Sequence, residues 1–128
     1  MPKELESGLL YVSEEFEVAG HLCACGCRAK VMTPLGPTEW SFEEVDGQPT
    51  LRPSIGSWQL PCQSHYWIIG GTVRWSSKWT PEQIEQGRRG EEERTRAYFE
   101  SRKAAKPGRL AALWHWLKEL AGRAFRRR

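Results

Sequence analysis

Short runs of apolar and β-branched residues follow one another over the first 76 residues, each bounded by glycine, proline or aspartate. This pattern predicts short strands of an antiparallel, β-rich domain. The predicted strands are residues 9–12, 29–33, 40–45, 49–52, 65–69 and 72–75. Asp46-Gly47 and Gly70-Gly71 are hairpin-type turns, so we expect each pair of strands that they join to be hydrogen-bonded. Residues 15–22 fit a strand and a short helix equally well.

The pattern changes at Thr80, where Thr-Pro-Glu-Gln is typical of a helix start. Thr80 is the predicted N-cap, Pro81 suits the first helical position, and Gln83 completes a capping box. A charged helix is predicted from there to about residue 106, and a second, amphipathic helix at 109–125. We therefore expect an α+β protein, with a β-rich metal-binding domain at 1–79 and a helical C-terminal extension at 80–128.

The charge of the chain is divided unevenly between these two parts. Residues 1–76 carry five Lys or Arg and nine Asp or Glu, whereas residues 77–128 carry fourteen and seven. We expect the basic C-terminal helix to contact a partner protein or an anionic surface. Its apolar stripe fits packing on the β-rich domain, an interfacial membrane helix, or a helix that binds in a groove. Glutamates 91–93 interrupt the basic positions, which disfavours nucleic acid as the partner.

The sequence also bears on the compartment of the protein. No apolar stretch reaches the roughly 20 residues that a membrane-spanning helix needs, and the polar start of the chain lacks the apolar centre of a secretory signal. We therefore expect a cytoplasmic protein whose cysteines stay reduced. Clustered thiols then favour a metal site or catalysis over disulfides.

Four cysteines and one histidine are concentrated in two short segments. Cys23, Cys25 and Cys27 alternate in the first, and Cys62 and His65 form a C-x-x-H pair in the second. Two disulfides would need at least one bridge inside the tight first segment, which is sterically unfavourable. Thiolate and imidazole are ligands that Zn²⁺ prefers, so these five residues are the predicted ligands of a zinc ion. These are five candidates for four positions, and His21 is a sixth. The surplus leaves open both a closed structural site and a catalytic zinc with a bound water.

Four motifs follow one another along the β-rich part: CACGC at 23–27, PSIG at 53–56, CQSHYWI at 62–68 and V-R-W at 73–75. In this order they resemble a bacterial family catalogued as a domain of unknown function. Its members occur beside genes for ubiquitin-like modifiers and their activating and conjugating enzymes. The resemblance covers roughly residues 8–90. It implies a peptidase whose partner is a ubiquitin-like modifier, which trims the modifier's C-terminal tail or removes the modifier from its targets.

A peptidase needs an activated nucleophile and a group that moves its proton. Ser64, between two predicted ligands, and Ser54, within the PSIG motif, are the predicted polar residues of the site. Ser54 can orient a zinc-bound water or act itself as the nucleophile, with His65 or His21 as the base. We therefore predict a peptidase that depends on zinc. The alternative is a zinc-stabilised binding or adaptor module in the same pathway, which does not cut.

Overall fold

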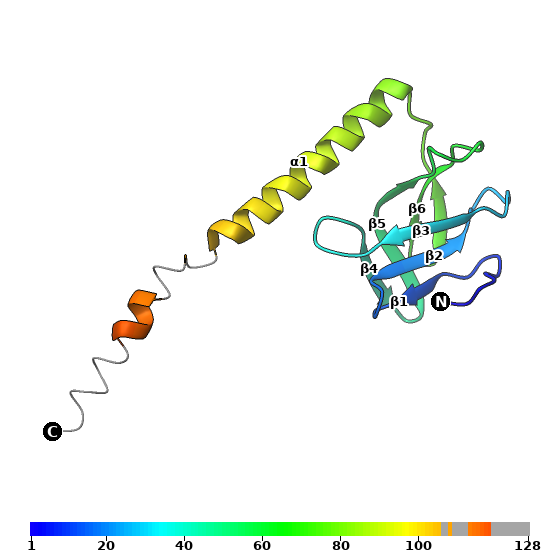
Figure 1. Cartoon of the computed structure of the whole chain (residues 1–128). Coiled ribbons are helices and arrows are strands. Elements are labelled where there is room, and N and C mark those ends of the chain that lie inside the picture. The colour runs from blue at the N-terminus through cyan, green and yellow to red at the C-terminus, as the bar shows by residue number, and fades with distance from the viewer. Residues whose placement is uncertain (106–107, 109–112, 119–128) are drawn as a thin grey trace. The chain divides into compact units, whose positions relative to one another are not determined.

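The computed structural model describes residues 1–105, 108 and 113–118 of the chain (Figure 1). Within this part, seven strands precede one long helix. The strands are β1 (Tyr11–Ser13), β2 (Val18–Leu22), β3 (Lys30–Pro34), β4 (Ser41–Val45), β5 (Gln48–Gly56), β6 (His65–Ile69) and β7 (Thr72–Trp75), and the helix is α1 (Pro81–Ala105). The predicted order of short strands followed by helix is confirmed.

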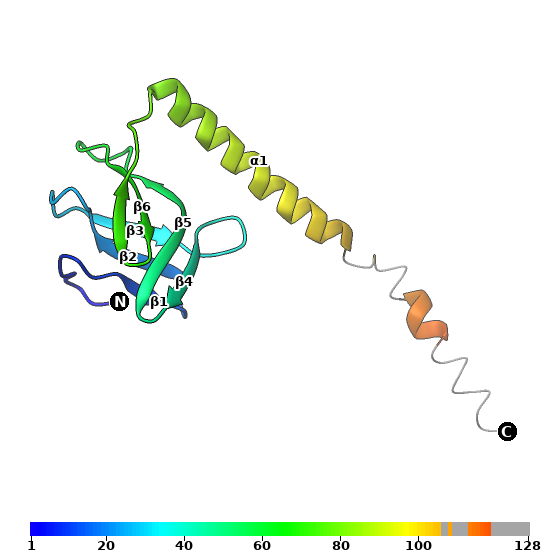
Figure 2. The same ribbon diagram turned by 180° about the vertical axis from the view of Figure 1, so that it is seen from behind.

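The strands form two antiparallel sheets in simple chain order. The first sheet is β1-β2-β3 and the second is β4-β5-β6-β7, and every neighbouring pair is antiparallel (Figure 2). Both predicted hairpins are present, because Asp46-Gly47 joins β4 to β5 and Gly70-Gly71 joins β6 to β7. The ambiguous segment 15–22 contains β2, the central strand of the first sheet. Pairing with β1 and β3 decides a choice that local sequence left open.

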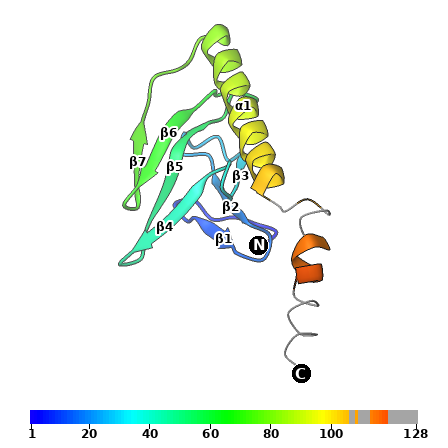
Figure 3. The same ribbon diagram turned by 90° about the vertical axis from the view of Figure 1, so that its left-hand side faces the viewer.

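The core lies between the two sheets, which face each other when the strands are viewed from the side (Figure 3). Ala19 of β2 meets Leu51 and Ile55 of β5 and Tyr66 of β6, and each of these four side chains is at most 2 % exposed. His21 Nε2 lies 2.7 Å from the Tyr66 hydroxyl, so a buried hydrogen bond also links the first sheet to the second. The core is small, and few large side chains are fully buried. A domain of this size commonly needs a metal or disulfides as well.

Helix α1 begins where the capping box predicted. The Gln83 N–H donates to the Thr80 hydroxyl at 3.3 Å, and the Thr80 N–H donates to Gln83 Oε1 at 2.9 Å. These reciprocal bonds satisfy two backbone donors at the helix start. The first ten residues of α1 belong to one compact unit with the strands, Met1–Gly90, and the chain from Glu91 onward forms a second unit. The domain boundary at 79/80 stays a prediction.

Of the second predicted helix, only 113–118 lie within the described residues, and these are helical. The remainder of 109–125 lies outside them, so its packing and its contact with a partner or an anionic surface stay predictions. No helix of the described part is long and apolar enough to cross a membrane.

Candidate functional site

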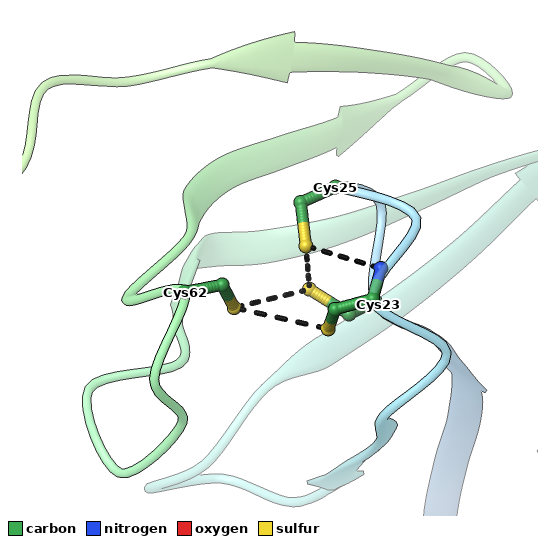
Figure 4. Close-up of side chains that lie close together, drawn as sticks. Cys23, Cys25 and Cys62 are labelled. Carbon is green, nitrogen blue, oxygen red and sulfur yellow. Dashed lines mark hydrogen bonds between the residues drawn. The ribbon is translucent and has the colours of Figure 1, made fainter.

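Two loops bring the four cysteines together at one end of the sheets. After β2, the Cys23 N–H donates to the Ala29 carbonyl at 2.8 Å and the Gly26 N–H donates to the Cys23 carbonyl at 3.1 Å. These bonds close a tight turn, in which Gly26 adopts a φ of 87° that other residues rarely accept. The second loop, between β5 and β6, carries Cys62 to the same place (Figure 4).

The sulfur atoms are spaced as the ligands of one metal ion would be. The Cys23 sulfur lies 3.5 Å from that of Cys25 and 3.8 Å from that of Cys62, and Cys27 and Cys62 are 3.9 Å apart. All four sulfurs lie within 4.8 Å of one another. Four thiolates bound tetrahedrally at about 2.3 Å from zinc would be about 3.8 Å apart. The distances fit such a shell and are far longer than a disulfide bond.

Hydrogen bonds and charge also favour a cation among these thiols. The Ser64 hydroxyl donates to the Cys62 sulfur at 3.3 Å and lowers the pKa of Cys62. The same hydroxyl, helped by the Cys27 N–H, lowers the pKa of Cys25 to about 6. The pKa of Cys27 rises to about 11, because its interactions with Cys25 and the other thiols outweigh the Ala29 backbone hydrogen bond. Thiolates this close repel one another, and a metal ion removes that repulsion.

A second constellation lies on strands β5 and β6. His65, the first residue of β6, has its Nε2 atom 2.9 Å from Ser54 Oγ on β5. The register of these strands is irregular here: between the pairs Leu51–Ile68 and Ile55–Tyr66, three residues of β5 lie opposite one residue of β6. Bulges of this kind re-aim side chains and are frequent beside active sites.

The other imidazole nitrogen is held by the backbone. His65 Nδ1 lies 2.6 Å from the Ser77 carbonyl oxygen, which can only accept a hydrogen bond. Nδ1 must therefore carry the proton in the neutral ring, and Nε2 is left to accept one from the Ser54 hydroxyl. This is the order of nucleophile, base and orienting acceptor that a serine hydrolase uses, with a carbonyl in the place of a carboxylate.

Two tryptophans cover the histidine. The Trp58 and Trp79 rings lie 5.0 and 5.1 Å from the imidazole, centroid to centroid, and stack on each other at 5.4 Å. His65 is only 5 % exposed as a result, whereas Ser54 is half-buried. The base is thus shielded from water, whereas Ser54 keeps part of its surface exposed.

The structure divides the predicted site residues into separate groups. Cys23, Cys25, Cys27 and Cys62 form a cysteine cluster that could hold a metal ion, whereas His65 lies outside it with Ser54 and Ser77 at its two nitrogens. Ser64 contacts the cysteine cluster through Cys62.

His21 belongs to neither group. It hydrogen-bonds Tyr66 in the core, where burial lowers its pKa to about 4. Since a base must reach the hydroxyl that it deprotonates, this geometry favours His65 over His21 as the partner of Ser54.

Three parts of the site were not found from the sequence: the Ser77 carbonyl, Trp58 and Trp79. A backbone carbonyl has no residue signature, and tryptophans in a β-rich domain are expected as core. Gly56 could have indicated the position of Trp58. A Cβ at residue 56 would lie 2.4 Å from the Trp58 ring, so only glycine fits there. A glycine with no turn to make often marks such a close approach.

Comparison with protein families agrees with this arrangement. Residues 1–76, more than half of the chain, match the model of a family described as bacterial ubiquitination-like system serine protease (BubE). Searches of curated proteins and of solved structures gave no match. The match confirms the resemblance to a family tied to bacterial ubiquitin-like systems, and its description specifies a protease. The chain belongs to the BubE family of serine proteases of bacterial ubiquitination-like systems.

Proposed function

We propose that the protein is a serine peptidase in which Ser54 is the nucleophile and His65 the general base. The observation that carries this proposal is the pair of hydrogen-bond distances at the imidazole, 2.9 Å to Ser54 Oγ and 2.6 Å to the Ser77 carbonyl. The family description, which specifies a serine protease, supports the same chemistry. In this mechanism zinc takes no part in the chemical step. The zinc dependence that the sequence predicts would then arise from the stability of the fold.

The nucleophilic attack and the proton transfers of the reaction can be assigned to these groups. Ser54 Oγ attacks the scissile carbonyl while its proton passes to His65 Nε2, and the Ser77 carbonyl keeps the ring in the required tautomer. The C–N bond then breaks, and His65 returns the proton to the departing amine. Water, deprotonated by His65, hydrolyses the resulting Ser54 ester and regenerates the free hydroxyl.

The four cysteines would hold a structural zinc ion. A shell of four thiolates is closed, whereas hydrolytic zinc sites keep one position for water. The ion would crosslink the turn after β2 to the loop before β6, between strands of different sheets. Such a crosslink supplies folding free energy that the small core lacks.

For the substrate, we propose the peptide or isopeptide bond that follows the C-terminal residue of a ubiquitin-like modifier. The family's place in a bacterial ubiquitination-like system supports this assignment. The same place in the pathway is compatible with the alternative of an adaptor that binds the modifier without cutting. The Ser54–His65 hydrogen bond favours the peptidase, because an adaptor has no need of an oriented hydroxyl.

The test uses the full chain, loaded with zinc, and a ubiquitin-like modifier from a bacterial ubiquitination-like system that carries a C-terminal extension. Mass spectrometry of the products gives the bond that is cut, and Ser54→Ala and Ser64→Ala are compared as matched serine variants. We expect Ser54→Ala to abolish cleavage with its metal content and fold unchanged, and Ser64→Ala to remain active. Cleavage by Ser54→Ala would refute the serine mechanism. A folded wild-type protein that binds the modifier and cleaves neither precursor nor conjugate would establish the adaptor instead.

A further inference from the structure

The tryptophans on His65 are each accommodated by a glycine. A Cβ on Gly56 would lie 2.4 Å from the Trp58 ring, and a Cβ on Gly87 would lie 2.7 Å from Cζ3 of Trp79. Both distances are shorter than real side-chain contacts allow, so any larger residue would push the rings. The two indoles therefore pack on His65. Gly56 lies against the Trp58 ring, and Gly87 lies against the Trp79 ring.

Gly87 lies in the interior of α1, where glycine weakens a helix relative to alanine. Nothing about helix formation favours it there, whereas its contact with Trp79 does. The residues from Pro81 to Gly90 belong to the same compact unit as the strands, so this contact forms within one body. The start of α1 thus touches the aromatic cover of the catalytic histidine.

From these contacts, and on the basis of the proposed serine mechanism, we infer that Trp79 is a positioning residue for catalysis. Backed by Gly87, it fixes the His65 imidazole between Ser54 and the Ser77 carbonyl. Trp79 and Gly87, like Ser77, lie beyond residues 1–76, which match the family model. Three single residues from beyond the matched region, Ser77, Trp79 and Gly87, would therefore support catalysis.

His65 needs this packing because the hydrogen-bond acceptor at its Nδ1 atom is a neutral carbonyl. A carboxylate would hold the imidazole through a charge-assisted hydrogen bond, which is about twice as strong as a bond to a neutral carbonyl. With the Ser77 carbonyl, the ring depends more on packing to stay in one orientation. Trp79 meets it edge-on at an interplanar angle of 72°, and Trp58 packs on it at 60°. Rotation of the imidazole away from Ser54 would require both indoles to move.

The experiment measures how fast Ser54 is phosphonylated by a small alkyl fluorophosphonate, so no peptide substrate is needed. In this reaction Ser54 Oγ bonds to phosphorus, the P–F bond breaks, fluoride leaves, and His65 accepts the hydroxyl proton. Variants of the full-length chain are Trp79→Ala, Trp79→Phe and Gly87→Ala. Trp75→Phe, at an exposed tryptophan of β7, and Gln86→Ala, at an exposed position of α1, are the matched controls.

We expect Trp79→Ala to lower the phosphonylation rate about 100-fold and Gly87→Ala about tenfold, since displacement of a catalytic group by about 1 Å has effects of this size. Trp79→Phe should recover most of the rate, and both controls should keep it. In peptide cleavage the loss should fall on kcat with KM unchanged. Wild-type phosphonylation rates in folded Trp79→Ala and Gly87→Ala would refute the positioning role. If wild type and Ser54→Ala are labelled equally at another residue, the proposed function itself fails, and the two failures are thus distinguishable.

Discussion

Replacement of Gly56 by alanine tests how tightly the site is packed. The new methyl carbon would lie 2.4 Å from Cε2 and Nε1 of Trp58 and 2.6 Å from Cζ2. An ordinary contact needs at least 3.4 Å, so the ring must move by about 1 Å. Because Trp58 packs on His65 and stacks on Trp79, the displacement reaches the base directly. A shift of this size at a catalytic group lowers the rate by about 100-fold, and overpacking destabilises a fold by about 1–3 kcal/mol.

The assay pairs kcat for cleavage of the extended modifier with the free energy of unfolding in urea. We expect Gly56→Ala to lose kcat about 100-fold while it stays folded at 25 °C with its metal bound. Gly36→Ala is the matched control, because a Cβ at Gly36 meets only Glu39 Cγ, at 4.0 Å. Unchanged kcat for Gly56→Ala would show that the position of Trp58 does not matter to the base, and the reasoning about the aromatic cover would be refuted.

Other predictions concern the cysteine cluster and the core. Zinc analysis should give one ion per chain. A strong chelator or Cys62→Ser should unfold the β-rich domain, because structural zinc supplies about 10–16 kcal/mol in small domains. Circular dichroism that shows an intact fold after chelation would contradict the structural role. Ser64→Ala removes the hydroxyl that donates to Cys62, so zinc affinity should fall about 10-fold to 100-fold in a chelator competition while kcat is kept. Tyr66→Phe leaves His21 without its buried partner and should cost about 1–3 kcal/mol in urea unfolding, again with kcat kept.

The fold was largely predictable because its signals are local. Each predicted strand carries its own apolar run, and the turns Asp46-Gly47 and Gly70-Gly71 determine which strands pair. The Thr80–Gln83 capping box placed the helix start correctly for the same reason. Segment 15–22 was undecided because β2 is defined by its two neighbours, and the arrangement of two sheets around Tyr66 depends on long-range packing that local patterns do not encode.

The sequence predicted which residues belong to the site, but it predicted much less well which of their side chains contact one another. All four cysteines meet as expected, because thiols clustered in two segments have one obvious common use. The spacing of Cys62 and His65 matched a ligand pair, yet the structure turns the imidazole toward Ser54 instead. Cys62 lies in the loop before β6, whereas His65 is the first residue of β6 and pairs with Gly56 of β5. The bulge in β5 adds a change of direction that only the paired strands reveal.

That C-x-x-H spacing nevertheless has a consequence for catalysis. Cys62 belongs to the cysteine cluster and lies three residues before His65. Ser64 both contacts Cys62 and, through its carbonyl, accepts the Ser57 N–H at 2.8 Å. A zinc ion at the cysteines would therefore fix the loop that leads into β6 and its first residue, His65, although it touches no reacting atom. Metal loss and active-site loss should then coincide in any activity assay, and such an assay alone would mistake this protein for a metallopeptidase. Measurements on Ser54 itself, made on folded protein that keeps its metal, separate a metal that supports the base from a metal that performs the hydrolysis.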